Sequence, residues 1–245
     1  MSWVSYITIG SIIIDDIVDA NGYSTMGILG GGASYAVAGM RVWSEQTALI
    51  AAIGSGFPDA ARQQLGAITN INGLVARPVP QPRFWQLFEA DGTRHEVART
   101  DFEVFQQIPV RPEELPAFAA QARGVYLQTA TAEQITAWAV HLRLLNPEIV
   151  ILWEPWEIFY EPDRLAELEL VARQVDIICP QTVELSWMVG ETEPNRQLDK
   201  LLDCGFQCVA LRLGSDGSLV GASAIQQHIE PVPITAVSYT HLTLP

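Results

Sequence analysis

The chain has 245 residues, a net charge of −14 at pH 7, and a hydrophobic fraction of 49%. This composition excludes a disordered chain and is sufficient for one large α/β domain with a substantial core. A surface this acidic repels phosphate backbones, so we expect no nucleic-acid partner. Because no apolar run reaches the length of a membrane span and no secretion signal is evident, we expect no membrane partner and a cytoplasmic location.

Strand-like and helix-like segments alternate in the first half of the chain. In order, the pattern predicts a strand at Val4–Ile9, a helix at Ser34–Trp43, a buried strand at Ala48–Ile53, a helix from Pro58 to about Leu65, and strands at Phe84–Ala90 and Thr93–Arg99. The last two flank Asp91-Gly92, a strong signal for a two-residue hairpin.

The same alternation continues in the second half. It predicts a strand at Val125–Gln128, a helix capped by Thr131 that ends near Asn146, a strand at Ile149–Trp153, a helix at Arg164–Gln174, a strand at Asp176–Cys179, helices at Val183–Val189 and Arg196–Leu202, and a strand at Cys208–Leu213 followed by a turn and another strand. Repeated strand–helix–strand units indicate a mostly parallel sheet with helices on both faces. The stretch Ile12–Met26 and the hairpin break this rhythm, and we expect them to form a small β lid over a cleft.

Ligands of such sheets bind beyond the carboxyl ends of the strands, so the residues after each strand are the first candidates. Asp15 follows the first strand, and its carboxylate can accept hydrogen bonds from two sugar hydroxyls. A solvated turn aspartate is the alternative, and Asp16 and Asp19 are rivals for the same role.

A glycine run, Gly30-Gly31-Gly32, precedes Ser34 and a predicted helix. Glycines permit close backbone approach, and a helix N-terminus offers N–H groups to an oxygen-rich ligand. An ordinary loop with Ser34 as N-cap remains the alternative.

Gly54-Ser55-Gly56 resembles the start of a dinucleotide fingerprint, but Asp59 occupies the third glycine position, and no acidic residue ends a strand about twenty residues later. Nicotinamide binding is therefore the weakest hypothesis. The three cysteines, Cys179, Cys204 and Cys208, are interpreted as small apolar residues of a reduced protein, with zinc ligation as the alternative.

Two candidates lie in the second half. Glu184 opens a helix, where it would either help to hold Mg²⁺ beside nucleotide phosphates or only complement the helix dipole. Gly214-Ser215-Asp216-Gly217 ends a strand and is either a hairpin turn, which the local pattern favours, or a backbone loop against a nucleotide.

Taken in order, six segments resemble the PfkB/ribokinase family of carbohydrate kinases. They are Gly10–Asp15, Gly30–Trp43, Ile53–Asp59, Arg83–Arg94, Pro180–Glu184 and Leu211–Val220. Each is weak alone, whereas their order and spacing are fairly specific. The stretches SYAVAGMR and ILWEP are similar to the maintenance-of-killer branch. The resemblance implies a ribokinase-like three-layer α/β/α fold over residues 1–237 and phosphorylation of a sugar or related small hydroxylated substrate by ATP with Mg²⁺.

The resemblance also implies residue roles. Asp15, Gly30, Gly31 and Ser34 would hold the substrate, Glu184 would organise Mg²⁺, and Gly214, Ser215 and Gly217 would contact the nucleotide. Three positions depart from the family pattern: Gln181 replaces an Asn, Ser34 stands where many sugar kinases have an Asn, and Gly56 replaces an Asp. These departures leave the identity of the sugar open. A homodimer formed through the lid is the expected protein partner.

The last eight residues, SYTHLTLP at 238–245, do not continue the family pattern. Family members continue into a D-T-x-G-A-G-D segment, which forms an anion hole and carries the catalytic base. We therefore interpret residues 238–245 as a non-native tail and expect an incomplete, inactive and poorly soluble chain with no catalytic residue of its own, His241 included. A non-catalytic, regulatory ligand-binding relative is the second hypothesis.

Overall fold

The computed structural model describes residues 4–129, 131–155, 165–222 and 225–233. The chain divides into two compact units, with the boundary between Ala119 and Ala120. Residues 238–245, including His241, lie outside the described residues.

The first unit contains a parallel arrangement of three strands, β1 (Tyr6–Ile9), β4 (Thr47–Ser55) and β5 (Asn70–Pro80), in the order β1-β4-β5. Every residue from Thr47 to Ile53 is buried, as expected for a parallel strand covered on both faces. Helix α1 (Gly32–Trp43) packs against β1 and β4, and α2 (Asp59–Ile68) packs against β5 and α1. The predicted strand Ala48–Ile53 and the helices that flank it are confirmed.

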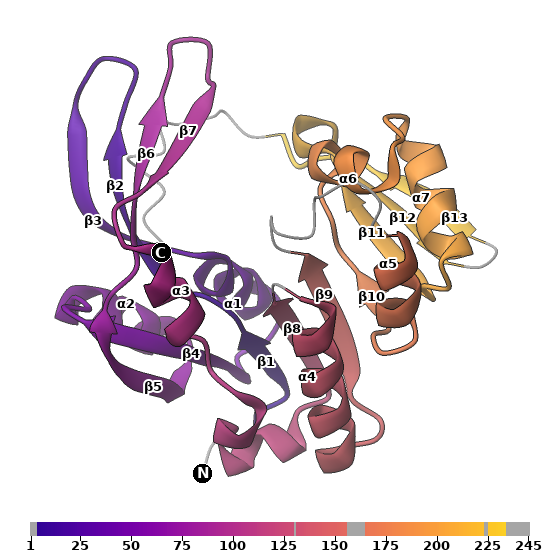
Figure 1. The fold of residues 1–245 in the computed structure, drawn as a ribbon, viewed down its shortest axis with the longest axis horizontal. Helices are drawn as coiled ribbons and strands as arrows, with labels where there is room; N and C mark the ends of the chain where they lie inside the picture. The colour runs from indigo at the N-terminus through magenta and orange to yellow at the C-terminus, as the bar shows by residue number, and fades with distance from the viewer. Residues whose placement is uncertain (1–3, 130, 156–164, 223–224, 234–245) are drawn as a thin grey trace. The chain divides into compact units, whose positions relative to one another are not determined.

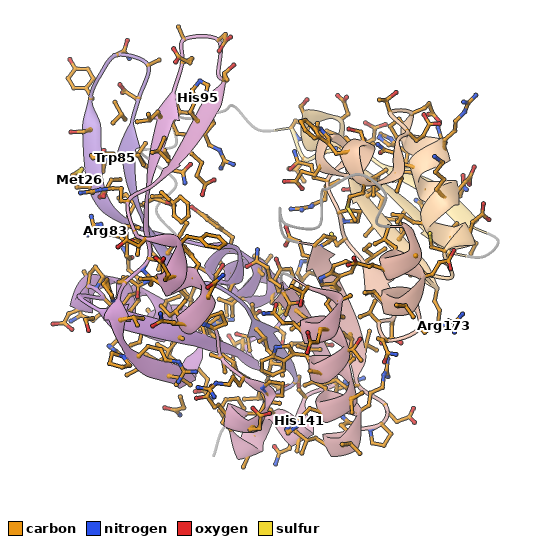
Figure 2. The ribbon with its side chains drawn as sticks, in the orientation of Figure 1. Met26, Arg83, Trp85, His95, His141 and Arg173 are labelled. Carbon is orange, nitrogen blue, oxygen red and sulfur yellow. The ribbon has the colours of Figure 1, made fainter. Side chains whose placement is uncertain are left out.

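A second sheet of four strands rises from this unit and is called the lid sheet below (Figure 1). Its order is β3 (Ser24–Gly30), β2 (Ile13–Val18), β6 (Arg83–Phe88) and β7 (Arg94–Ala98). Only the β2–β6 pair is parallel. The prediction that the early stretch and the later hairpin join in one β element is confirmed. Figure 2 labels Met26, Arg83, Trp85 and His95 on this sheet.

The hairpin between β6 and β7 differs from the sequence prediction. Phe88 pairs with Arg94, so the connection is longer than the Asp91-Gly92 dipeptide. The amide of Glu89 donates to the carbonyl of Thr93 at 2.8 Å, which leaves residues 90–92 as a three-residue loop. The amide of Gly92 donates to the carbonyl of Glu89 at 3.0 Å, and Gly92 has a φ of 87°, as is common at the last position of such a loop.

The first unit is completed by short helical segments. Helix α3 (Phe102–Gln107) packs against β5, and the 3₁₀ segments η1 (Pro112–Glu114) and η2 (Ala117–Gln121) follow it. Arg77 of β5 forms a salt bridge of 2.5 Å with Glu114, which ties η1 to the sheet.

The described part of the second unit contains six strands in chain order: β8 (Gly124–Thr129), β9 (Val150–Pro155), β10 (Ile177–Ile178), β11 (Cys208–Arg212), β12 (Ser218–Ala222) and β13 (Ile225–Ile229). The first four are parallel, and the last two are antiparallel to their neighbours. The helices are α4 (Ala132–Leu145), α5 (Leu165–Ala172), α6 (Thr182–Val189) and α7 (Pro194–Asp203).

Local signals explain where these helices begin and end. The hydroxyl of Thr131 accepts a hydrogen bond of 3.1 Å from the amide of Gln134, which confirms the predicted N-cap of α4. Asn146 ends that helix in extended conformation, because a proline follows it. The chain therefore has the predicted α/β class with mostly parallel strands. No helix of the described residues is long and apolar enough to cross a membrane.

Candidate functional site

The carboxylate of Asp15 lies on one face of the lid sheet and is 7% exposed. Its Oδ1 accepts a hydrogen bond of 3.0 Å from Nε2 of Gln86 on β6. Burial raises the pKa of Asp15 to about 6, although the hydrogen bond from Gln86 acts to lower it. Among the described residues, the buried carboxylate of Asp15 pairs with an amide and with no cation, so it is a suitable acceptor for ligand hydroxyls.

Gly30 and Gly31 lie directly against β2. A Cβ added to Gly30 would stand 2.0 Å from Oδ2 of Asp15, and one added to Gly31 would stand 2.5 Å from the carbonyl of Ser11. Gly31 also has a φ of 96°, a conformation that favours glycine. The structure therefore brings together Asp15, Gly30 and Gly31, three of the four residues to which the sequence assigned substrate binding.

Ser34, the fourth, lies in the first turn of α1 and is buried. Its hydroxyl donates a hydrogen bond of 2.9 Å to the carbonyl of Gly30. The alternative that Ser34 is the N-cap is wrong, because the helix begins at Gly32 and Gly31 occupies the cap position. The amides of Ala33 and Ser34 donate to the carbonyls of Ser11 and Gly31, so this helix end is largely satisfied internally.

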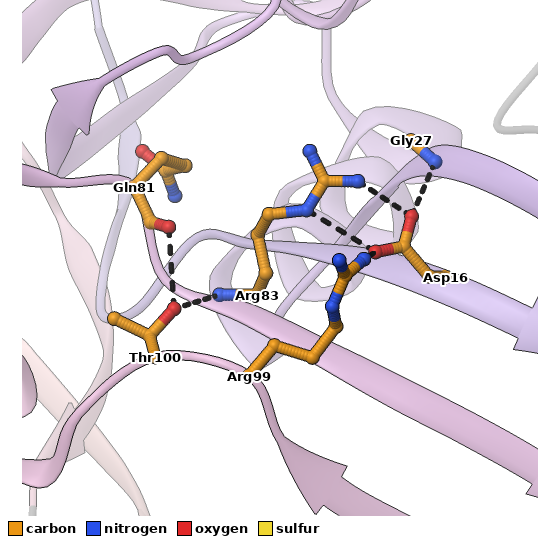
Figure 3. Close-up of polar contacts among 6 residues, drawn as sticks. All are labelled: Asp16, Gly27, Gln81, Arg83, Arg99 and Thr100. Carbon is orange, nitrogen blue, oxygen red and sulfur yellow. Dashed lines mark hydrogen bonds and ion pairs between the residues drawn. The ribbon is translucent and has the colours of Figure 1, made fainter.

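Asp16, the first rival of Asp15, is the next residue along β2, so its side chain faces the other side of the lid sheet, and the residue is 0% exposed. It forms salt bridges with Arg83 (2.6 Å) and Arg99, and it accepts a hydrogen bond from the amide of Gly27 (Figure 3). The guanidinium of Arg99 also stacks on the ring of Trp85, 4.5 Å from its centroid. Although burial raises the pKa of Asp16, the hydrogen bonds from Arg83 and Gly27 outweigh it, and the pKa is lowered.

Asp19 and Gly54 have structural roles. Asp19 accepts hydrogen bonds from the amides of Asn21 and Tyr23 and so forms the turn between β2 and β3. A Cβ on Gly54 would stand 2.6 Å from the backbone of Pro80, and the amide of Gly54 donates to the side chain of Gln81. The close contact with the end of β5 therefore explains why this residue is a glycine, and no bound dinucleotide is needed to explain it.

In the second unit, Glu184 lies in the first turn of α6 and is half-buried. Among the described residues it has no ion-pair or hydrogen-bond partner. Gln181 is the N-cap of this helix, without a side-chain cap, and forms a parallel bridge with Arg212. No three His, Cys, Asp or Glu side chains gather in the described part of the chain as a ready-made metal site. Cys179, Cys204 and Cys208 are half-buried free thiols.

The Gly214–Gly217 segment forms a short 3₁₀ turn, η4 (Gly214–Asp216), that joins the antiparallel strands β11 and β12. A Cβ on Gly217 would stand 2.1 Å from the carbonyl of Ile229, so this glycine is required by its contact with β13. Gly214 also has a positive φ, of 63°, but a Cβ there would meet nothing within 4 Å. Gly214 is exposed.

Sequence reasoning missed a polar cluster near Glu184. Glu154, close to the end of β9, forms a salt bridge of 2.6 Å with Arg212 at the end of β11 and accepts a hydrogen bond from the hydroxyl of Tyr126. Burial and the charge of Glu184 raise the pKa of Glu154, against the effect of Arg212. Burial also raises the pKa of the neighbouring Cys179 thiol to about 11, so this thiol is not a nucleophile. The cluster forms because Tyr126, Glu154 and Arg212 come from three strands of one sheet, β8, β9 and β11. No local motif predicts that these side chains meet.

Three histidines lie among the described residues, and two of them, His95 and His228, contact an exposed glutamate. His95 lies on the exposed hairpin of the lid sheet, 3.6 Å from Glu89, and His141 lies on α4 (Figure 2). His228 contacts the carbonyl of Asp216 at 2.7 Å and so supports the η4 turn.

No family model matches the sequence. An uncharacterized protein of Schizosaccharomyces pombe is 27% identical over 247 aligned positions that cover 89% of this chain, and the chain spans 65% of the length of that relative.

The fold is similar to solved structures of carbohydrate kinases. Ribokinase from Arabidopsis thaliana, complexed with ribose and ATP, has a TM-score of 0.71 and 16% identity, over 96% of this chain and 80% of that chain. A putative ribokinase II from Escherichia coli, in complex with ATP and Mg²⁺, has a TM-score of 0.70 and 15% identity, over 96% of this chain and 80% of that chain. The chain therefore has the ribokinase-like α/β fold, with a mostly parallel central sheet.

Proposed function

We propose that this chain belongs to an ATP-dependent kinase that phosphorylates a hydroxyl group of a sugar or a related small substrate. The observation that carries the proposal is the contact between Asp15 and Gly30, where any larger residue would collide with the carboxylate. It places the buried carboxylate of Asp15 beside two buried glycines, and such an acceptor suits a small molecule rich in hydroxyl groups. The similarity to a ribokinase complexed with ribose and ATP supports the same conclusion.

On the substrate side, Asp15 would accept hydrogen bonds from two adjacent hydroxyls. Gly30 and Gly31 would allow the substrate to approach the backbone, and Ser34 would fix the carbonyl of Gly30 through its hydrogen bond of 2.9 Å. Positioning of this kind is a large part of catalysis in phosphoryl transfer, because the protein contributes little covalent chemistry.

On the nucleotide side, Gly214, Ser215 and Gly217 would contact ATP, and Glu184 would hold Mg²⁺ through water. The donor set fits this cation, because Mg²⁺ prefers carboxylate oxygens and water, and the carboxylates of Glu184 and Glu154 lie near one another, with Arg212 paired to Glu154. When bound, Mg²⁺ supplies neutralisation of the phosphate oxygens during transfer. The chain's own residues would fix the metal's position and orient the nucleotide.

By the family resemblance, the base and the anion hole belong to a segment after Val237. It is still a prediction that residues 238–245 are a non-native tail and that the chain as given is inactive. Loss of a single anion-hole donor costs about 10²–10³ in rate, so loss of the hole together with the base predicts turnover near background. A maintenance-of-killer-like branch, a cytoplasmic location and a homodimer through the lid sheet are also still predictions.

The test is ADP release with D-ribose and D-fructose, measured in a coupled assay on this chain and on the product of the gene extended past codon 237. We expect turnover only in the extended protein, and we expect Asp15→Asn to abolish sugar-dependent turnover there. Asp19→Asn is the matched control, because Asp19 only forms a turn. An extended protein that contains the D-x-x-G-A-G-D segment but does not transfer phosphate to any sugar would contradict the proposal.

A non-catalytic ligand-binding relative is the second candidate, favoured by Gln181. This residue replaces the family's Asn at the N-cap of α6, and its side chain makes no cap hydrogen bond. A relative of this kind would bind sugar in a titration without any ADP release by the extended protein, and Gln181→Asn would not create turnover.

A further inference from the structure

Gln86 is the polar neighbour of Asp15 on the lid sheet, and no sequence motif singles it out. Its side chain comes from β6, and the residue is 6% exposed. Nε2 donates to Oδ1 of Asp15 at 3.0 Å. The other end of the amide, Oε1, is buried and has no hydrogen-bond partner among the described residues.

The chemistry of the pair fixes the orientation of this amide. An ionised carboxylate can only accept hydrogen bonds, so the NH₂ group of Gln86 must face Asp15 and the carbonyl must face away. A buried carbonyl without a partner is unfavourable, and such groups in native proteins commonly mark a bound water, ion or ligand. Gln86 therefore presents an acceptor beside Asp15 that a ligand donor would satisfy.

Both groups beside the glycines are acceptors, because Asp15 contributes a carboxylate and Gln86 contributes Oε1. Among the charges that act on Asp15, Glu96 and Asp16 are negative and Arg94 is positive. Arg94 lies 3.6 Å from Glu96, and Asp16 is paired with its own arginines. No unpaired cation in this group is available to receive a ligand anion.

We propose that Gln86 binds the substrate directly, and that the Asp15–Gln86 pair selects a neutral polyol with two adjacent hydrogen-bond donors over a sugar acid. The inference rests on the proposed function, since it assigns the substrate class of the same site. If a carboxylate replaced either hydroxyl, its oxygens would face the carboxylate of Asp15 and Oε1 of Gln86, which are also acceptors. This mismatch weakens ligand binding more strongly than a change of ligand size would.

The test is isothermal titration of the full chain with D-ribose, D-fructose and D-gluconate. The Gln86→Met variant keeps the volume and removes both polar atoms, and we expect it to weaken binding of the neutral sugars about tenfold or more. Gln63→Met makes the same chemical change at an exposed position of α2 and should bind as the wild type does. D-Gluconate should bind at least about tenfold more weakly than the neutral sugars.

A second variant separates ligand contact from a purely structural role. In Gln86→Glu, two adjacent carboxylates can share one proton, which keeps both the bond to Asp15 and an acceptor toward the ligand. Neutral-sugar affinity of this variant should therefore decrease as the pH rises from about 6 to about 8, whereas the wild type should not weaken over that range. Thermal melts of each variant establish that it is folded.

Equal binding of D-ribose by folded wild type and Gln86→Met would overturn the inference, and so would preferential binding of D-gluconate. Either result leaves the proposed kinase activity standing, because that activity is read from ADP release by the extended protein. Conversely, selective binding of neutral sugars that depends on Gln86, without any ADP release by the extended protein, supports the inference and contradicts the kinase.

Discussion

The contact between Gly30 and Asp15 leads to the sharpest test of the candidate site. In Gly30→Ala, the new methyl group would stand 2.0 Å from Oδ2 and 2.8 Å from Cγ of Asp15. Real carbon atoms do not approach so closely, so the carboxylate or the β2–β3 pair must move. Gly30 has no positive φ, so the effect of this substitution comes from the collision and not from backbone strain.

The expected magnitude follows from two contributions. Overpacking of a buried site costs about 1–3 kcal/mol. Displacement of the Asp15 carboxylate also breaks its hydrogen bond to Gln86, which adds about 1 kcal/mol. We therefore expect Gly30→Ala to lower the free energy of unfolding by about 2–4 kcal/mol and to weaken sugar binding in parallel.

Urea unfolding of four proteins measures this effect: wild type, Gly30→Ala, Asp15→Ala and the double variant. The collision disappears when Asp15 is truncated, so the cost of Gly30→Ala should be smaller in the Asp15→Ala background, with a coupling energy of about 1–3 kcal/mol. Gly39→Ala is the matched control. Gly39 lies in α1 with nothing within 4 Å of an added Cβ, so alanine should stabilise that helix by about 0.5–1 kcal/mol.

Two results would refute the reasoning. If Gly30→Ala unfolds at the same urea concentration as the wild type, the lid sheet relaxes freely around the methyl group, and glycine is not required there. If the two substitutions are additive, Asp15 is not the group that the new side chain meets. In either case the geometry of the sugar site would need to be revised.

Three further predictions follow from buried groups. Burial raises the pKa of Asp15 from 3.8 to about 6, so the folded state favours the protonated carboxyl, and the stability that this preference contributes is lost as the pH rises through that range. Relative to Asp15→Asn, the free energy of unfolding of the wild type in urea should decrease by on the order of 3 kcal/mol between about pH 4 and about pH 7. Asp16→Asn leaves two arginines beside a neutral amide and should lower the free energy of unfolding by about 3 kcal/mol. Faster exchange of the backbone amides in the lid sheet would measure this loss. Gly217→Ala meets a carbonyl at 2.1 Å and should lower the melting temperature by more than Gly56→Ala, where the φ is also positive, at 82°, but the space is open.

The sequence is a good guide to elements whose signal is local. The continuous apolar run of β4 and the cap of α4 were predicted because burial on both faces and hydrogen bonding at a helix end each need only neighbouring residues. Strand β5 was missed because its asparagines, glycine and prolines are typical of loops. Yet Gly73 is a requirement of the strand, since a Cβ there would stand 2.6 Å from the carbonyl of Leu49. Strand β13 was missed because all its residues are exposed and carry no alternating pattern.

The candidate site divides in the same way. Asp15 and Gly30 belong to short motifs, so their residue types could be recognised without a structure. Gln86 and Arg212 lie inside segments that resemble the family, but no motif singles out either residue. They become neighbours of Asp15 and Glu154 only through the pairing of β2 with β6 and the order of β9, β10 and β11. Strand register is a property of the folded sheet, and a single sequence contains little information about it.

Asp15 and Asp16 show how one strand can use the same residue type for two purposes. Because side chains alternate along β2, the two carboxylates face opposite sides of the lid sheet, and their pKa values shift in opposite directions. Arginines neutralise Asp16, so its charge holds the lid sheet together and is not available to a ligand. Asp15 has only an amide, so it keeps the capacity to accept hydrogen bonds. A shift of β2 by one residue would turn Asp15 to the face that holds the two arginines and remove its carboxylate from the proposed sugar site, and the ion pairs of Asp16 therefore fix the register on which the proposed sugar binding depends.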